Sequence, residues 1–516
     1  MERTRKVVFL SVCSGDKDLI AQWTASGDLP ALDHLMRTGL VGAQTGLPGV
    51  FVGAHWPSWI TGCHPGKNRV HSWRQLTPGS YDTYRCNAGD HMQRPPFWRY
   101  LSEAGRRLCV LDIPHSRILP GINGLQTVEW GAHDAAYGFQ ASTPDLDNEI
   151  RTMFGLHPVS GESDGMIDMA KPLEFRDTLL RGIRMKTALT RHFYAKENWD
   201  FFAQVFTEAH CGGHLLWNHH DRGFRWDAAP PPEDQGDALK DVYVAIDHAL
   251  GEILDGLRDD ATIIFSANHG MGPKYVAQHL LDRILVELGY AARKRHPPKP
   301  RSWRDVVDGP MTWGWQHLPD AMRARLTVLR DLKREIVNPT VSPSEIIEAD
   351  AGQVFTVVNN NAHGAIRVNL IGREPQGKVA PGAAYEALLD SLTMDLKGLM
   401  NLETGRPIVA EIYRCDDLYP GPERRHLPDL FVQWSLDAPV NAVGSNRLPR
   451  LEGRYRYVRS GEHRPDGMFI VKGPGIAPGR IAQPVRCIDF APTITRMLGV
   501  ALPDDIDGRQ IPGLGG

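Results

Sequence analysis

Three histidines in this sequence have the residue type and, for two of them, the spacing of a metal site. His210 and His214 lie four residues apart within residues 206–217, and His463 lies within residues 460–467. Three neutral imidazoles that converge can bind one zinc ion and leave a position open for water or substrate. We therefore predict one divalent metal ion, with Zn²⁺ as the expected metal, at His210, His214 and His463. Iron, cobalt or nickel would also accept imidazole.

Further polar side chains follow predicted strands. Cys13, His210, Asn268 and His269 each come directly or almost directly after a short apolar run. These runs have the length and composition of buried parallel strands, and they are residues 7–12, 200–207 and 261–266. In an open parallel sheet, sites lie beyond the carboxyl ends of the strands. We therefore expect the four side chains to belong to one site.

The order of predicted elements indicates the fold class. Further strands are expected at residues 108–113 and 468–471, and helices at 30–38, 175–197, 242–257, 384–400 and 487–498. Strands that alternate with helices favour an α/β fold with a mainly parallel sheet flanked by helices. We expect a single domain over residues 1–516. Residues of about 274–350, which include a basic, proline-rich run at 293–301, are expected to form a cap or insertion.

Composition excludes several classes of protein. The chain has 516 residues, of which 42% are hydrophobic and 23% charged, and its net charge is −3. These values are ordinary for a soluble globular protein and lack the basic excess of a nucleic-acid binder, so we expect no nucleic-acid polymer as a partner. No apolar run has the length of a signal-peptide core or a membrane helix. The seven scattered cysteines favour a reducing setting, so we predict a cytoplasmic protein without a membrane partner. The oligomeric state is not indicated.

Several phrases of the sequence coincide, in order, with one family. They are Leu-Pro-Ala-Leu at 29–32, Thr-Gly-Cys-His-Pro-Gly-Lys at 61–67, Ser-Ala-Asn-His-Gly-Met at 266–271, Ser-Gly-Glu-His-Arg-Pro-Asp-Gly-Met-Phe-Ile at 460–470 and Asp-Phe-Ala-Pro-Thr-Ile at 489–494. With them the chain resembles the type I phosphodiesterase/nucleotide pyrophosphatase family of the alkaline phosphatase superfamily, from about Lys6 to about Ile511. The resemblance implies an alkaline-phosphatase-like fold and a small anionic or nucleotide-like substrate.

The resemblance also implies a site with two zinc ions. In the family, one ion takes an Asp, a His four residues later and a C-terminal His. The other ion takes an Asp after the first strand, an Asp-His pair after a later strand, and a nucleophilic Thr or Ser. The two ions stabilise the attacking and leaving oxygens, and the hydroxyl forms a covalent intermediate that water then opens.

Carried over position by position, this pattern is only partly present. The family's three histidines remain, and they are His214, His269 and His463. The family's three acids and its nucleophile are replaced, and their positions hold Cys13, Val52, His210 and Asn268. The chain is therefore expected to be a divergent member of the family.

The replacements predict altered chemistry. Val52 has no hydroxyl, so the covalent route cannot pass through that position. The second metal site would consist of Cys13, Asn268 and His269, and we expect it to be empty because an amide lacks the charge of a carboxylate. Cys13 itself could be a nucleophilic thiolate, a metal ligand or a small buried apolar residue. A shift of its loop would instead place Asp16 in the metal position, although the strand register argues against it.

Other residues near these positions have expected roles. His55, Trp56 and Val52 could face the substrate, because they lie at or just after the lost nucleophile; Trp56 could equally pack beneath the site. His269 would act as acid or base or would orient the leaving group, and Asn268 would donate a hydrogen bond to it. Together with Cys13 these are the predicted catalytic residues.

Three functions remain open. The first is a metal-dependent hydrolase or group transferase acting on a phosphate, sulfate, sulfamate or related ester or anhydride, with water or a substrate nucleophile in place of the threonine. The second is a catalytically inactive family member that binds a nucleotide-like or anionic ligand or a protein partner. The third is a diesterase with a rearranged dinuclear site that uses Cys13 and Asp16. The sequence favours the first function.

Overall fold

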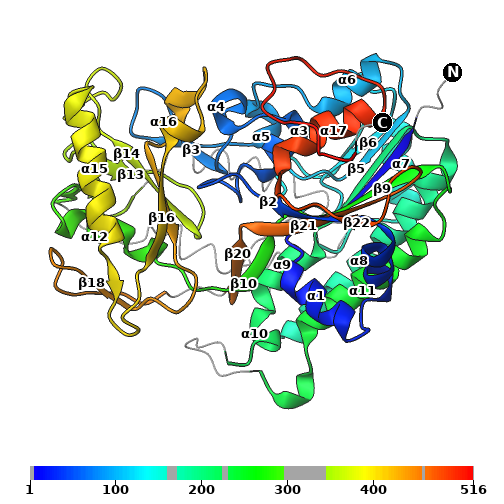
Figure 1. Cartoon of the computed structure of the whole chain (residues 1–516), viewed down its shortest axis with the longest axis horizontal. Coiled ribbons are helices and arrows are strands. Elements are labelled where there is room, and N and C mark those ends of the chain that lie inside the picture. Colours follow the sequence, from blue (N-terminus) through cyan, green and yellow to red (C-terminus); the bar gives the residue numbers. More distant parts are fainter. Residues whose placement is uncertain (1–4, 160–170, 224–230, 296–343, 456–458, 515–516) are drawn as a thin grey trace.

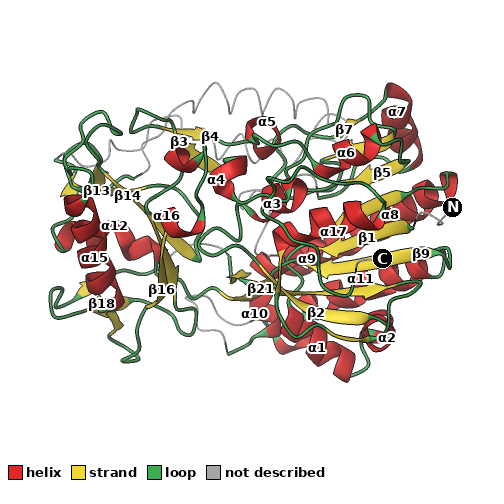
Figure 2. Cartoon of the chain, turned by 45° about the horizontal axis from the view of Figure 1, so that its top comes forward, coloured by secondary structure: helices red, strands yellow, loops and turns green. Residues whose placement is uncertain are grey.

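The computed structural model describes residues 5–159, 171–223, 231–295, 344–455 and 459–514 (Figure 1). A large sheet with helices on both faces forms one lobe, and a smaller sheet with its own helices forms the other. In both views the helices α12 (Leu281–Glu287) and α15 (Ala383–Lys397) lie at the end of the molecule opposite the N-terminus (Figure 2). None of the helices in these ranges is long and apolar enough to cross a membrane.

The main sheet of the described residues has ten strands, and its centre is parallel. The order is β22-β2-β21-β9-β1-β8-β5-β6-β7, with β23 paired to β2. The parallel central strands are β9 (Ala261–Ala267), β1 (Lys6–Val12), β8 (Phe201–Phe206), β5 (Leu108–Leu111) and β6 (Gly124–Val128). The antiparallel β21 (Asp466–Lys472) separates β9 from β2 (Leu40–Thr45), and the short outer strands are β7 (Gln140–Ala141), β22 (Gly479–Arg480) and β23 (Val485–Arg486).

The central strands are buried on both faces, which explains why each is a continuous apolar run. In β1, Val8 packs with the helices of one face, whereas Phe9 packs with those of the other face. The register pairs Val12 with both Phe206 and Ala267. The segments after β1, β8 and β9 therefore begin at the same edge of the sheet, and the predicted mainly parallel sheet is confirmed.

Helices cover both faces of this sheet. One face carries α1 (Lys17–Ala25), α2 (Pro30–Thr38), α7 (Pro144–Met153), α8 (Pro172–Lys196), α9 (Glu208–Leu215) and α11 (Ala238–Leu254). The other face carries α3 (His55–Thr61), α6 (Phe97–Glu103) and α17 (Phe490–Met497). The predicted helix at residues 30–38 coincides with α2, and the others differ by a few residues at their ends. The predicted flanking by helices is confirmed.

The second lobe is built around an antiparallel sheet of the order β13-β14-β17-β16. Its strands are β13 (Val354–Thr356), β14 (His363–Val368), β17 (Leu430–Trp434) and β16 (Val409–Arg414), and α12 and α15 share its apolar core. The described ends of the expected insertion, 274–295 and 344–350, belong to this lobe. Residues 296–343, with most of the basic run, lie outside the described residues, so the boundaries of the cap stay a prediction.

A two-stranded ribbon joins the two lobes. The strands β10 (Gly270–Pro273) and β20 (Gly461–Arg464) pair antiparallel, with Met271 opposite His463. Just beyond the ribbon, Lys274 Nζ lies 2.9 Å from Glu462 Oε2, and both side chains are buried. The ribbon therefore returns the chain from the second lobe to the edge of the main sheet where β9 ends.

The buried His71 predicts a dependence of stability on pH. Burial lowers the pKa of His71 to about 3, whereas an unfolded histidine titrates near its ordinary value of 6.5. Between these values only the unfolded chain binds the proton, so stability is present at neutral pH and is lost as the pH falls, by about 1.4 kcal/mol for each pH unit. The variant His71→Gln should show a smaller loss of melting temperature between pH 7 and pH 5. The exposed His34 offers the matched control, since His34→Gln should retain the wild-type slope; equal slopes for all three proteins would contradict the prediction.

Candidate metal centre

The structure brings His210, His214 and His463 together. His210 and His214 lie one turn apart on α9, directly after β8, and His463 lies on β20. Their ring centroids are 4.6–4.9 Å apart, and one nitrogen from each ring lies within 4.8 Å of the others. All three side chains are buried. The group is therefore a candidate metal site.

The spacing of these nitrogens fits a metal ion. His214 Nε2 and His463 Nε2 are 3.1 Å apart, and two nitrogens at about 2.0–2.1 Å from a tetrahedral zinc ion would be roughly 3.3 Å apart. His214 Nδ1 lies 3.0 Å from the carbonyl oxygen of Gly461, to which it can donate. A backbone acceptor on the far nitrogen is the usual way to direct the other nitrogen at a metal.

The electrostatic environment favours the ligating form of these rings. Burial lowers the pKa of His214 well below its ordinary value, and the nearby Arg459 cation and His210 add to the effect. Burial likewise lowers the pKa of His463, together with the neighbouring imidazoles. Neutral imidazole is the form that binds a metal ion. At neutral pH no proton has to leave these two rings before an ion can bind.

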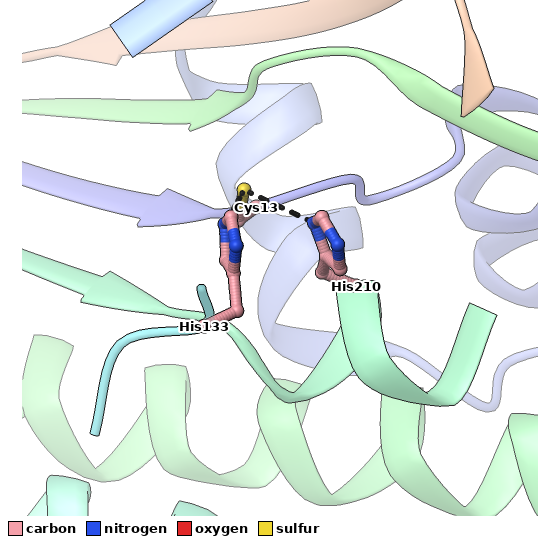
Figure 3. Close-up of side chains that lie close together, drawn as sticks. All are labelled: Cys13, His133 and His210. Atoms are coloured by element: carbon pink, nitrogen blue, oxygen red, sulfur yellow. Dashed lines mark hydrogen bonds between the residues drawn. The ribbon is translucent and has the colours of Figure 1, made fainter. Parts of the chain in front are cut away.

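Cys13 follows β1 and lies among polar groups. Its Sγ is 3.3 Å from His133 Nε2 and 3.8 Å from His210 Nδ1 (Figure 3), and the Trp56 indole donates to it at 3.4 Å. Burial alone would raise the pKa of the thiol, but the two imidazoles outweigh it and hold the pKa well below the ordinary value. Cys13 also packs within the apolar core on one face of the sheet, so the ligand, the thiolate and the buried interpretations all stay open.

His133 is a site residue that the sequence did not indicate. It lies in the loop after β6 and stacks on His210, with ring centroids 3.8 Å apart and planes inclined by 20°. Asp112 accepts hydrogen bonds from the Gly131 amide at 2.7 Å and from the amide before it, which shapes the loop. His133 Nδ1 lies 3.0 Å from Asp134 Oδ2. The adjacent His133 and Asp134 are the one feature of the sequence that could have indicated a site here. No spacing in the sequence connects them with the other histidines.

Ser14 also contacts the cluster. Its hydroxyl lies 3.1 Å from His210 Nδ1 and 3.4 Å from His463 Nδ1, and the side chain is fully buried. The residue has φ +57°, a left-handed conformation that is uncommon for a side-chain-bearing residue and often marks a functional turn. The Ser14 hydroxyl can therefore orient the rings of His210 and His463.

Asn268 and His269 lie beside the cluster, but Asn268 is not placed as a ligand. Its Oδ1 accepts hydrogen bonds from the backbone amides of Ser14 at 2.8 Å and His269 at 3.1 Å. Its amide nitrogen lies 3.7 Å from Cys13 Sγ, so the oxygen is directed away from the sulfur. The His269 ring is 4.7 Å from that of His463, and burial lowers the pKa of His269 to about 3.

The residues around the expected nucleophile position differ in their placement. His55 is buried, with its ring 5.6 Å from that of His269, and Trp56 contacts Cys13. Val52 is half-buried in the turn before α3, where Phe51 and His55 provide the rings that contact His269. The substrate-facing role of His55, Trp56 and Val52 stays a prediction.

Asp16 serves as the N-cap of α1. Its carboxylate accepts from the amides of Asp18 and Leu19, and from that of Met271 at 3.2 Å. This use of both oxygens argues against Asp16 as the metal-binding acid. A cleft of about 340 Å³ lies beside it, between the start of α1 and the β10–β20 ribbon that carries His463.

A buried ion pair links the two segments that carry His133 and His210. Lys186 Nζ on α8 lies 2.7 Å from the carbonyl oxygen of Gly131, 3.0 Å from Thr207 Oγ1 and 3.1 Å from Glu208 Oε1. Gly131 lies two residues before His133, and Glu208 begins the helix that carries His210. The two side chains of the pair have no exposed surface. The ammonium group therefore sets the position of both segments.

Comparison with known proteins identifies the family. The sequence profile of the family described as type I phosphodiesterase / nucleotide pyrophosphatase matches residues 7–341. The chain belongs to this family. It thereby belongs to the alkaline phosphatase superfamily, as the motifs indicated. No curated protein sequence matches the chain.

Solved structures of low sequence identity align over nearly the whole chain. Murine ectonucleotide pyrophosphatase/phosphodiesterase 5, as an inactive variant in complex with AMP, is 10% identical, with a TM-score of 0.47 over 98% of this chain and 97% of that one. A second structure of the same murine protein is 11% identical, with a TM-score of 0.47 over 98% of each chain. Phosphonoacetate hydrolase from Sinorhizobium meliloti 1021, in complex with phosphonoacetate, is 12% identical, with a TM-score of 0.48 over 97% of this chain and 96% of that one.

Loss of the buried ammonium group should destabilise this family member strongly. In the variant Lys186→Met, Glu208 would remain buried without its ammonium partner and with only His157 Nε2, at 3.1 Å, beside it, and breaking such a pair costs about 3–5 kcal/mol. Chemical denaturation would measure the change in the free energy of unfolding. Lys196 on the same helix pairs with Glu149 at the surface, so Lys196→Met should cost less than about 1 kcal/mol. Similar losses for the two variants would show that Lys186 has no special role.

Proposed function

We propose that this protein is a metal-dependent hydrolase or group transferase that acts on a phosphate, sulfate, sulfamate or related ester or anhydride. The observation that carries the proposal is the convergence of His210, His214 and His463 at the edge of the sheet in a member of a phosphodiesterase family. Zn²⁺ is the expected ion, because three imidazoles suit it. When bound, the ion would polarise an oxygen of the phosphoryl or sulfuryl group that is transferred. It would also lower the pKa of a water molecule bound to it.

The residues around this group would position the reactants. Val52 provides no hydroxyl, so water or a nucleophile of the substrate takes the place of the family's threonine. The Ser14 hydroxyl holds the rings of His210 and His463 through their Nδ1 atoms. His269, whose pKa burial lowers to about 3, is neutral at pH 7 and can orient the leaving group by donating a hydrogen bond from its ring N–H.

Positive side chains near the imidazoles support a small anionic or nucleotide-like substrate. The Arg459 cation contributes to the low pKa of His214, and Lys274 acts in the same direction. Arg464 follows His463, and burial lowers the pKa of its guanidinium to about 10, so the group remains charged at pH 7. Because the imidazoles are buried, a small substrate suits the site better than a nucleic-acid polymer. A cytoplasmic location remains part of the proposal.

One observation favours a second candidate, a catalytically inactive member that binds an anionic or nucleotide-like ligand or a protein partner. The Asn268 oxygen is occupied by two backbone amides, and the resemblance implies that Val52, which has no hydroxyl, takes the nucleophile position. Such a protein would show a higher melting temperature in the presence of a nucleotide or phosphonate, without turnover of any ester.

Removal of one imidazole should abolish both metal binding and activity. The variant His214→Ala should lose its bound ion and at least about 100-fold in the rate of ester hydrolysis, because a ligand of the metal is missing. Elemental analysis and hydrolysis of p-nitrophenyl phosphate, bis(p-nitrophenyl) phosphate and p-nitrophenyl sulfate would measure the two effects.

The control variant for this experiment is His220→Ala. His220 lies on the next helical turn, α10 (Trp217–His220), and pairs with Asp237, so its loss should leave metal content and activity unchanged. A wild-type protein that binds no divalent ion would contradict the proposal. Turnover that survives in His214→Ala would also contradict it.

A further inference from the structure

The sulfur of Cys13 lies in an environment unlike that of an ordinary buried cysteine. Cys109, for comparison, lies on β5 within the apolar core and is fully buried. Cys13 is equally buried, yet its Sγ faces ring nitrogens of His133 and His210 from two different segments. A thiol and two imidazoles that converge in this way have the donor set of a zinc site.

The distances within this group fit tetrahedral coordination. A zinc–sulfur bond of about 2.3 Å and a zinc–nitrogen bond of about 2.0–2.1 Å would separate sulfur and nitrogen by roughly 3.6 Å. The separations from Cys13 Sγ are 3.3 Å to His133 Nε2 and 3.8 Å to His210 Nδ1, one slightly shorter and one slightly longer than that value. The rings of His133 and His210 stack 3.8 Å apart with planes inclined by 20°, so binding of an ion in the plane of both rings would require one ring to turn out of the stack.

The surrounding groups are those that support a thiolate–imidazole site. Asp134 Oδ2 lies 3.0 Å from His133 Nδ1, and a carboxylate on the far nitrogen directs the near nitrogen to a metal and raises its basicity. The indole nitrogen of Trp56 lies 3.4 Å from Cys13 Sγ, and the amide nitrogen of Asn268 lies 3.7 Å from it. Both donate hydrogen bonds, which stabilise negative charge on the sulfur.

We propose that Cys13, His133 and His210 form a second metal site, which binds a divalent ion of the zinc type through one thiolate and two imidazoles. The site goes beyond the proposed function, which needs the ion of His210, His214 and His463. It also differs from the family's second site, because His133 supplies a ligand that Asn268 cannot. A thiolate ligand selects Zn²⁺ or Co²⁺ over the hard ions Mg²⁺ and Ca²⁺.

An ion at this site would bind His210 at Nδ1 and would displace the contact of that atom with the Ser14 hydroxyl. The two groups of ligands share His210, and the thiolate distinguishes them. A cobalt ion bound by Cys13 would show a sulfur-to-cobalt charge-transfer absorption in the near ultraviolet, whereas one bound by imidazoles alone would not. Optical spectroscopy of the full chain, freed of metal with a chelator and titrated with Co²⁺, therefore reports on this site without any measurement of activity.

The wild-type chain is expected to show the charge-transfer band, and Cys13→Ser is expected to lose it. His133→Ala should weaken the affinity for Co²⁺, measured by titration of this band, by about tenfold or more, as loss of one ligand does. His214→Ala should retain the band, because His214 belongs only to the three-histidine group. Cys109→Ser, which removes a buried thiol away from the site, should retain it as well. Circular dichroism would establish that each variant is folded.

The proposal is overturned if the wild-type chain binds Co²⁺ without the band, or if the band persists in Cys13→Ser. In either case the contacts of Cys13 would be those of a hydrogen-bonded thiol only. Such a result leaves the proposed function intact when hydrolysis still depends on His214. Conversely, a band of the expected origin in a protein that hydrolyses no ester would support the second site and contradict the proposed function.

Discussion

The structure of the candidate metal centre depends on the buried ammonium group of Lys186. This group lies between the carbonyl oxygen of Gly131 and the carboxylate of Glu208, and an unpaired charge in that position would be costly. The chain can therefore bury Lys186 only when the loop after β6 and the start of α9 are both in place. Those two segments carry His133 and His210, whose rings stack 3.8 Å apart. One ion pair thus positions two side chains from distant parts of the sequence.

A second buried pair completes the centre from the other lobe. Lys274 and Glu462 lie at the far end of the β10–β20 ribbon, and the described residues between them include the smaller sheet and its helices. The ribbon brings His463 within 3.1 Å of His214, although 249 residues separate them in the sequence. Assembly of the site is therefore coupled to folding of the second lobe, since the third imidazole reaches the sheet edge only through that ribbon.

The residue types at these positions affect the charge of the candidate centre more than its location at the edge of the sheet. The resemblance implies carboxylates at the three positions that hold Cys13, His210 and Asn268 in this chain. Neutral imidazoles cost less to bury than carboxylates, and an ion bound by His210, His214 and His463 would keep more of its positive charge. The Arg459 cation acts in the same direction. Such a centre would attract an anionic group more strongly than one balanced by acids.

The sequence by itself determined the parallel sheet and the pairing of His210 with His214. The strands β1, β8 and β9 are continuous apolar runs because both of their faces are buried, and His210 and His214 share a helix face through their spacing. His463 could be placed only by the resemblance to the family. The sequence did not reveal β6, because its five residues include Gln126 and Thr127 in an otherwise weak pattern.

Only the tertiary structure decided the partners of Cys13 and Asn268. His133 is 120 residues from Cys13, and no spacing rule connects residues that meet solely because two loops leave the same sheet edge. The Asn268 oxygen is occupied by backbone amides, which a sequence cannot show because hydrogen bonds form through space. The sequence thus gives the residue types at the centre. Packing of the folded chain decides which of their atoms face one another.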